Sequence, residues 1–500
     1  MKKFAFLTLV LILMMSLPAW ADKELKFAST VPTPSIDPAN NYAGWFTVRY
    51  GLGETLLKFD EAMRPVPWLA KAWSLIDENT WKFELNDGVT FHSGRPMTAG
   101  AVKESLERLM KINKRAAQEL AIVEITAQGQ AVIFRTAQPN PTLPNYLCEP
   151  YSSIIDVEAA ADDENISGTG PYKIQSFKSN DAAMVIKNET YWNGQPKLDR
   201  VTIRPIRDGG AMTMALKAGE VDAAEGLPYV NHNVFANDPA YKISSVPTSR
   251  VFMIYYNTAK PFTADQAVRQ AIGMSIDKEA YSRILLNGAG APAAGPFPAF
   301  LPYGGDKVQA RSFDPEGAAG LLEAAGYIDG NGDGLREKDG RKLSLKLCTY
   351  AKRVELPVIS EALQGQLRDL GVELAVEVVE SIDDVLAAGD FDLAAYSYIT
   401  TPTGDPWSFL NMISATDGLA NFGRFSEAKV DALLKEMRSE FAPEKRVETA
   451  LAVQREILAR DGYSFVAHLN MALVMKSTVS GLVAHPSDYY HINVETDISE

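Results

Sequence analysis

The chain is too long for a single hydrophobic core, and this limits its architecture more than any other feature. It has 500 residues, of which 46% are hydrophobic, whereas single cores stop growing at about 250 to 300 residues. Only Cys148 and Cys348 are present, so no disulfide framework holds small pieces together. A single bridge between these two cysteines stays open. We therefore expect at least two lobes.

The first 21 residues have the pattern of a secretory signal peptide. Lys2 and Lys3 precede an apolar run over residues 4–17, and Ala19 and Ala21 flank a tryptophan. The run is shorter than the roughly 20 residues of a membrane span, which argues against an uncleaved anchor. No cysteine follows the run, which argues against a lipoprotein. We predict cleavage near Ala21 and a periplasmic location.

The charge and the motif content exclude several classes of function. Acidic residues outnumber basic ones by 63 to 49, giving a formal charge of −14. Because there is also no basic run, nucleic acid and anionic membranes are poor partners. The sequence has no phosphate loop, dinucleotide fingerprint or nucleophile elbow, which argues against an enzyme and gives no sign of a cofactor.

Strand-like and helix-like segments alternate along the chain, which predicts an α/β fold. The β-rich runs 25–28 and 81–85 alternate with helical stretches at 99–110 and 265–275. We expect a signal peptide over residues 1–21, lobe I over 22–255, lobe II over 256–478, and a return to lobe I over 479–500. Two crossings between lobes make a hinge, and a cleft between hinged lobes is a favoured place for a ligand.

Two features suggest a metal site, and each has a simpler interpretation. Residues 329–340 have oxygen ligands at alternate positions, but Gly340 stands where a calcium loop needs a bidentate glutamate, so a solvated turn is favoured. The five histidines lack metal-site spacing. His485 and His491 are the closest pair, in a tyrosine-rich tail. We expect no direct metal site.

Several motifs, taken in order, resemble family 5 of the extracellular solute-binding proteins, the peptide and nickel class. They are Val66–Trp73, Thr80–Ala99, Gly168–Tyr172, Asn188–Trp192, Ala215–Asp222, Val268–Ile272, Asp277–Lys278 and Leu321–Tyr327. The resemblance implies a two-lobe, type II-like periplasmic binding fold with an extra subdomain in lobe I and a hinge. Such a protein closes on a small-molecule ligand and presents it to an ABC permease in the inner membrane. We expect a monomer.

Within the family, the chain resembles the branch that binds nickel chelates or metallophores. The likeness lies in Trp45 and in residues 48–56, 353–357 and 401–406. The expected cargo is a nickel or other transition-metal chelate, held through the chelator. Peptide-binding relatives usually have an aspartate where this chain has Pro402. A dipeptide or oligopeptide is the alternative cargo.

The resemblance and the strand pattern together give the candidate ligand-binding residues. Arg353 follows the strand 343–350 and is predicted to bind a ligand carboxylate; a surface pair with Glu355 is the alternative. Thr401, Thr403 and Gly404 follow the strand 392–399, at the edge where open α/β lobes bind ligands.

The remaining candidates each carry an alternative. Asp405 is either a ligand contact or the cap of a helix that starts near residue 407, and the cap is preferred. Asn421 and Arg424 form either a polar wall or an ordinary turn. Trp45 completes the set with Glu149, which stands where nickel-chelate binders have an arginine. Either Lys114 and Arg115 compensate this reversed charge, or Glu149 binds an amine of a different ligand.

Overall fold

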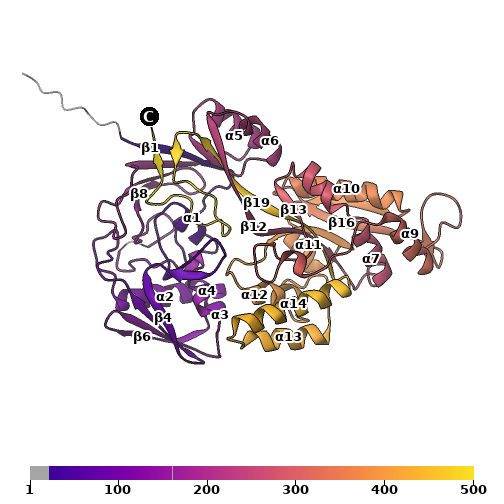
Figure 1. The fold of residues 1–500 in the computed structure, drawn as a ribbon, viewed down its shortest axis with the longest axis horizontal. Coiled ribbons are helices and arrows are strands. Elements are labelled where there is room, and N and C mark those ends of the chain that lie inside the picture. The colour runs from indigo at the N-terminus through magenta and orange to yellow at the C-terminus, as the bar shows by residue number, and fades with distance from the viewer. Residues whose placement is uncertain (1–21, 160, 500) are drawn as a thin grey trace, which may run out of the picture.

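The computed structural model describes residues 22–159 and 161–499. The predicted signal peptide, residues 1–21, lies outside the described residues. The chain forms two α/β lobes, with lobe I on the left of Figure 1 and lobe II on the right. This confirms the predicted fold class. Within the described residues, no helix is both long enough and apolar enough to cross a membrane.

One eleven-stranded sheet runs through both lobes, in the order β17, β16, β18, β12, β19, β11, β1, β10, β9, β8, with β13 paired to β19. The strands of lobe I are β1 (Glu24–Ser29), β8 (Tyr172–Phe177), β9 (Ala183–Lys187), β10 (Arg200–Pro205) and β11 (Ala223–Glu225). Those of lobe II are β13 (Gly290–Pro292), β16 (Ser344–Tyr350), β17 (Glu373–Val379) and β18 (Leu393–Ile399).

Two long strands, β12 (Tyr241–Tyr256) and β19 (Tyr463–Lys476), belong to both lobes. The start of β12 pairs with the end of β19, which in turn pairs with β11 of lobe I. The end of β12 pairs with β18 of lobe II. The register between β12 and β19 shifts between Pro247 and Val251. We propose that the lobes join at this shift, inside the strands, rather than at the strand ends near residues 255 and 478.

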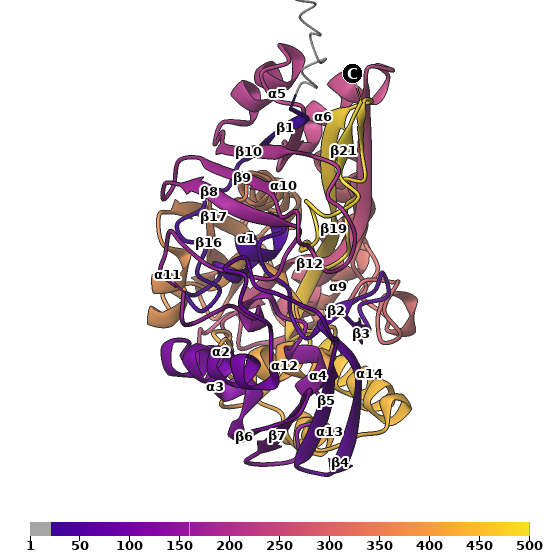
Figure 2. The same cartoon turned by 90° about the vertical axis from the view of Figure 1, so that its left-hand side faces the viewer.

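A four-stranded antiparallel sheet with two helices forms a subdomain of lobe I, at the lower end of Figure 2. Its strands are β4 (Ala70–Asp77), β5 (Thr80–Leu85), β6 (Ile122–Gln128) and β7 (Ala131–Thr136), and its helices are α2 (Ala99–Ile112) and α3 (Lys114–Leu120). In β5 the side chains of Trp81, Phe83 and Leu85 are buried in strict alternation with more exposed ones. This period of two places one face of the strand in the core.

The other helices cover the sheets. Lobe I has α1 (Gly44–Arg49), α4 (Leu143–Tyr146), the 3-10 turn η1 (Pro150–Ser152), α5 (Gly209–Lys217) and α6 (Tyr229–Ala236). Lobe II has α7 (Gln266–Met274), α8 (Lys278–Ala280), the π-turn η2 (Tyr281–Leu285), η3 (Gly305–Lys307), α9 (Pro315–Ala324), α10 (Glu355–Asp369), α11 (Ile382–Ala388), α12 (Pro406–Ser414), α13 (Ala428–Arg438) and α14 (Pro443–Ala459). Short ribbons are β2 (Leu57–Phe59) with β3 (Pro65–Pro67), β14 (Glu337–Lys338) with β15 (Arg341–Lys342), and β20 (Val479–Ser480) with β21 (Asp497–Ile498).

The two cysteines do not form the bridge that the sequence left open. Cys148 and Cys348 are both free and buried. The thiol of Cys148 donates to the carbonyl oxygen of Pro144 at 3.4 Å, whereas that of Cys348 donates to the carbonyl oxygen of Asp390 at 3.8 Å.

The calcium-like segment uses its carboxylates to close its own turn. Asp329 accepts hydrogen bonds from the backbone N–H groups of Gly332 and Gly334, at 2.8 and 3.0 Å. Asp333 accepts one from Lys342 at 2.6 Å. These bonds support the interpretation as a turn.

The Gly168–Tyr172 motif is glycine-rich because two backbones touch there. A Cβ added at Gly168 would lie 2.1 Å from the carbonyl oxygen of Leu52, and one at Gly170 would lie 2.2 Å from that of Gly51. The backbone N–H of Tyr172 donates to Gly51 at 3.0 Å. Since the obstacle is backbone, it cannot move aside as a side chain would.

We predict that Gly168→Ala lowers the free energy of unfolding by about 1 to 3 kcal/mol, the usual cost of overpacking. Gly100→Ala in α2 is the control, because the nearest atom to its added Cβ lies 3.6 Å away and alanine is the better helix former. Urea unfolding of both variants is the measurement. Equal stability of the two variants would contradict the packing argument.

Candidate functional site

The loop after β18 lies where the two lobes touch. The side-chain amide of Asn145, in α4 of lobe I, donates to the carbonyl oxygen of Thr403 at 2.8 Å. Gly404 has a φ of 67°, and a Cβ there would lie 2.2 Å from the carbonyl oxygen of Met63. Glycine is therefore required by both the backbone angle and the close approach of lobe I.

Two threonines of this loop carry buried hydroxyl groups without partners. Thr401 and Thr403 are 0% and 1% exposed. Neither hydroxyl has a hydrogen-bond partner among the described residues. An unpaired buried polar group costs about 1 to 3 kcal/mol. A polar ligand that bonded to these hydroxyls would remove that cost, so both remain proposed ligand contacts.

The carboxylate of Asp405 is fully used in hydrogen bonds within the protein. Its Oδ1 accepts the backbone N–H of Trp407 at 2.9 Å and so caps α12. Both carboxylate oxygens also accept hydrogen bonds from the guanidinium group of Arg446, at 2.6 to 3.0 Å. Both side chains are buried. These bonds favour the cap over the ligand contact that the sequence also allowed.

Asn421 and Arg424 lie in a turn. The amide of Asn421 donates to the carbonyl oxygens of Ala415 and Phe425, at 2.9 and 2.6 Å, and its Oδ1 accepts the backbone N–H of Phe425. Arg424 is exposed and has a φ of 55°. The contacts of Asn421 support the turn rather than a polar wall.

Trp45 belongs to an aromatic surface of lobe I, which we call the lobe I wall (Tyr42, Trp45 and Tyr489). The ring centroid of Trp45 lies 5.5 Å from that of Tyr42 and 6.1 Å from that of Tyr489. The guanidinium group of Arg49 lies 5.6 Å from the same ring. The Tyr489 hydroxyl donates to the carbonyl oxygen of Pro402 at 3.2 Å, so the wall reaches the loop of lobe II.

A second aromatic surface comes from lobe II, the lobe II wall (Tyr350, Tyr396 and Tyr398). Tyr396 and Tyr398 lie two residues apart on β18, with ring centroids 4.6 Å apart. The ring of Tyr350 lies 5.5 Å from that of Tyr396. Burial raises the pKa of Tyr398 to about 12, and Tyr42 of lobe I adds to that rise. The three rings therefore form one continuous aromatic surface on lobe II.

Glu149 is buried beside a cation. The Arg115 guanidinium donates to Glu149 at 3.0 Å and to Glu119 at 3.0 Å, and it lies 5.9 Å from the ring of Tyr42. Of the two cations that the sequence offered, Arg115 is thus the partner. Burial raises the pKa of Glu149 to about 7, with Glu119 adding to the rise and Arg115 opposing it.

Arg353 meets a second arginine that the sequence reasoning missed. Arg353 lies just before α10, and Arg250 lies on β12 at the register shift. Among the described residues, neither has a carboxylate oxygen within 4.0 Å, so the pairing of Arg353 with Glu355 is absent. Within the described part of the chain, the Arg250 guanidinium donates only to the Ser397 hydroxyl, at 3.3 Å. Burial and the nearby charge of Arg353 lower the pKa of Arg250 to about 10.

The tyrosines of the lobe II wall were also missed. Tyr396 and Tyr398 are spaced by two at the end of a strand, which places both rings on one face. That spacing was the available signal. Arg250 had a weaker one, as a charged residue that opens the apolar run 251–256.

The tail histidines are packed within the protein, and His491 lies beside two carboxylates. His491 is 1% exposed, with Nε2 3.3 Å from a carboxylate oxygen of Asp488 and Nδ1 3.7 Å from one of Glu225. Arg49 forms ion pairs with both acids. Over the described part of the chain, no three His, Cys, Asp or Glu side chains gather in a group that could hold a metal ion.

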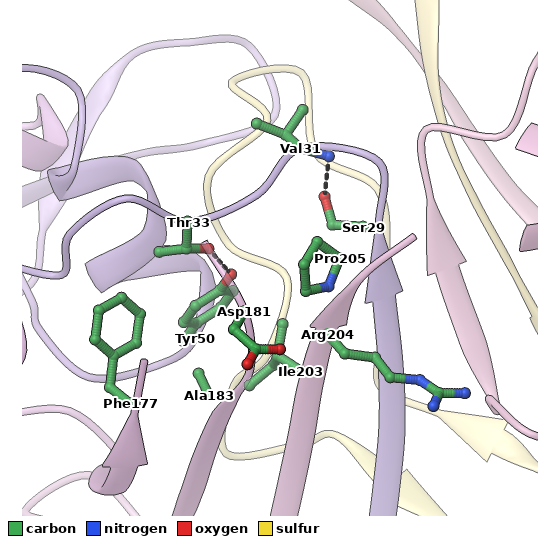
Figure 3. Close-up of a pocket in the computed structure, with 10 residues that line it drawn as sticks. All are labelled: Ser29, Val31, Thr33, Tyr50, Phe177, Asp181, Ala183, Ile203, Arg204 and Pro205. Carbon is green, nitrogen blue, oxygen red and sulfur yellow. Dashed lines mark hydrogen bonds between the residues drawn. The ribbon is translucent and has the colours of Figure 1, made fainter. Parts of the chain in front are cut away.

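A small hollow in lobe I, lined by residues of β1, β9 and β10 among others, is not a ligand site. Figure 3 shows the hydroxyl of Thr33 bonded to that of Tyr50 across it, and Val31 N–H bonded to the Ser29 hydroxyl. The space between these side chains does not admit a water molecule.

Residues 64–421 match the family described as "Bacterial extracellular solute-binding proteins, family 5 Middle". The nickel-binding protein NikA of Staphylococcus aureus is 28% identical over 480 residues, covering 95% of this chain and 94% of NikA. A crystal structure of NikA from S. aureus in complex with Ni(L-His)2 has a TM-score of 0.81 at 27% identity, covering 95% of this chain and 100% of that one.

A relative with a different cargo is similarly close. The probable D,D-dipeptide-binding periplasmic protein DdpA of Escherichia coli is 26% identical over 452 residues. The alignment covers 86% of this chain and 84% of DdpA.

We predict that Asp405→Ala destabilises the protein by about 3 to 5 kcal/mol, because it removes a cap and leaves Arg446 buried without its partner. Asp87→Ala is the control, since Asp87 pairs with Lys71 on the surface, where such pairs contribute at most about 1 kcal/mol. Chemical unfolding measures both. A loss below about 1 kcal/mol for Asp405→Ala would show that its bonds contribute little.

The raised pKa of Glu149 predicts a pH-dependent effect of Glu149→Gln. A carboxyl whose pKa is higher in the folded state stabilises the fold fully below its unfolded pKa, and this stability falls as the pH rises towards 7. The variant should therefore gain stability relative to the wild type between pH 5 and pH 8, by about 1 to 3 kcal/mol. Unfolding at several pH values is the measurement. A constant difference would mean that the ion pair with Arg115 keeps Glu149 charged throughout.

Proposed function

We propose that this chain, which belongs to the bacterial extracellular solute-binding proteins of family 5, captures a nickel or other transition-metal chelate between its lobes and delivers it to an ABC permease in the inner membrane. The family consists of binding proteins, so the ligand is released unchanged. A periplasmic, monomeric protein is part of the proposal.

The observation that carries the proposal is that Arg250 and Arg353, near Tyr350 of the lobe II wall, have no carboxylate partner among the described residues. Two neighbouring guanidinium groups repel a bare metal cation, but they bind carboxylates well, since each presents a planar fork of donors. A hydrogen bond to such a charged group contributes about 1.5 to 3 kcal/mol. The metal must therefore arrive inside an organic chelate that carries carboxylates.

The aromatic walls suit the same class of ligand. A flat ring of the ligand can stack on the tyrosine and tryptophan rings of these walls. In the S. aureus structure the bound chelate is Ni(L-His)2, whose carboxylates and imidazole rings have the chemistry that arginines and aromatic walls recognise. The hydroxyls of Thr401 and Thr403 would accept or donate further bonds.

Capture follows from lobe closure. The contacts of Asn145 with Thr403 and of Tyr489 with Pro402 join the lobes directly. A ligand that bonds to Arg250 on one side and to the lobe I wall on the other favours the joined state, because only that state offers both sets of contacts.

A dipeptide or oligopeptide is the second candidate. Its carboxylate would bind Arg250 and Arg353, and its ammonium group would bind Glu149, whose partner Arg115 is shared with Glu119. The similarity to the D,D-dipeptide-binding relative favours this candidate.

The test is a thermal-shift titration of the mature protein with nickel chloride, nickel with L-histidine, and dipeptides. We expect the nickel–histidine mixture to raise the melting temperature, because ligands stabilise the state that binds them. Arg250→Met and Arg353→Met should each weaken this binding at least about tenfold. Arg341→Met, an exposed arginine of lobe II, should leave it unchanged. Stabilisation by dipeptides alone would replace the proposed cargo with the second candidate.

A further inference from the structure

Lobe I contains a second hollow, separate from the lobe interface. It has a volume of about 510 Å³, which is within the range of small-molecule sites. Its lining comes from residues 48–68, 171–193 and 485–495, that is, from lobe I and the C-terminal segment that returns to it. The side chains that matter for its chemistry are Glu54, Lys58, Trp68, His485 and Tyr490.

The C-terminal segment separates this hollow from the lobe interface. Tyr489 lies against Trp45 of the lobe I wall. The next residue, Tyr490, lines the hollow, with its ring perpendicular to that of Trp68 at 5.6 Å and to that of His485 at 4.9 Å. Two neighbouring residues thus face different surfaces: Tyr489 contacts the lobe I wall, and Tyr490 lines the hollow.

Most acidic groups around the hollow already have hydrogen-bond or ion-pair partners within the protein. Glu54 accepts hydrogen bonds from Tyr191, Trp192 and Thr169, at 2.6 to 2.9 Å. The carboxylate of Asp60 closes its own turn, because it accepts hydrogen bonds from the backbone N–H groups of Ala62 and Arg64 and from the guanidinium group of Arg64. Glu495 pairs with a lysine at 2.5 Å, and Glu61 is exposed.

Two donors of the hollow, the Lys58 ammonium group and a ring nitrogen of His485, remain available for a ligand. Among the described residues, Lys58 has no carboxylate oxygen within 4.0 Å, and its ammonium group lies 5.7 Å from the centroid of Trp68. Nδ1 of His485 accepts the backbone N–H of Ser487 at 3.2 Å. Burial lowers the pKa of His485 to about 4, so at neutral pH the ring is uncharged and its Nε2 carries the proton.

We propose that this hollow is an accessory site for a small aromatic carboxylic acid. The ligand carboxylate would bind Lys58 and the Nε2–H of His485, and its ring would pack against Trp68 and Tyr490. An inorganic anion would leave the aromatic lining and most of the volume unused. An aromatic amine would place a second cation beside Lys58, with the nearby acids already bonded.

Isothermal titration of the mature protein with indole-3-acetate tests the proposal, with benzylamine and inorganic phosphate as comparison ligands. We expect binding of indole-3-acetate alone. Lys58→Met keeps the aliphatic stem and removes the charge, and it should weaken binding about tenfold or more. Lys71→Met, an exposed lysine of lobe I that pairs with Asp87, is the matched control and should bind as the wild type does.

Arg250→Met distinguishes this site from the lobe interface. The variant should bind indole-3-acetate normally even though it no longer binds the chelate. The proposal of an accessory site is thus tested independently of the proposed function. Loss of indole-3-acetate binding in Arg250→Met would place the ligand between the lobes and overturn the proposal. Equal affinity of the wild type and Lys58→Met, or no binding at millimolar concentration, would overturn it as well.

Discussion

The pairing of β12 with β19 is the interaction on which the arrangement of the site depends. Both strands continue from one lobe into the other, and their register shifts at the junction, between Pro247 and Val251, and again between Phe252 and Met253. The Thr248 hydroxyl donates to the carbonyl oxygen of Leu469 at 2.7 Å across that junction. Ser249 then accepts the backbone N–H of Thr400 at 2.9 Å. The loop that carries the predicted ligand contacts is therefore tied to the point where the lobes join, and so is Arg250.

Electrostatics explains why the site can keep uncommitted arginines. Arg49 is buried with two acids, Glu225 and Asp488, so that lobe I has a surplus of negative charge behind the lobe I wall. Asp488 raises the pKa of Arg250, opposing burial and the charge of Arg353. Arg250 is thus stabilised at a distance, without a direct partner that would occupy its donors. Its donors thus stay available for the ligand carboxylate that we propose.

Local patterns in the sequence predicted the local features, and the site was only partly predictable for that reason. The strand predicted at 392–399, which is β18, and the cap at Asp405 follow from periodicity and from residue type within a few positions. The rule that ligands bind at strand ends led to Thr401 and Thr403. Arg250 gave only a weak local signal, because the role proposed for it depends on the nearby charge of Arg353, which is distant in sequence. Asn421 was selected as polar, but its own turn uses its amide completely.

The buried polar groups of this protein differ in how far the protein itself satisfies their hydrogen bonds. Asp405 and Glu54 are surrounded by donors that satisfy their oxygens, as buried groups usually are. The hydroxyls of Thr401 and Thr403 lack partners in the described protein, and such groups lower stability. Other buried hydroxyls of the described protein, those of Ser282 and Thr349, also lack partners. The missing bonds therefore support the ligand role proposed for Thr401 and Thr403 only together with their place where the lobes touch. The same reasoning explains why the glycine-rich motif at Gly168–Tyr172 identifies the fold but not the cargo: its backbone contacts are complete within the protein and leave nothing for a ligand to satisfy.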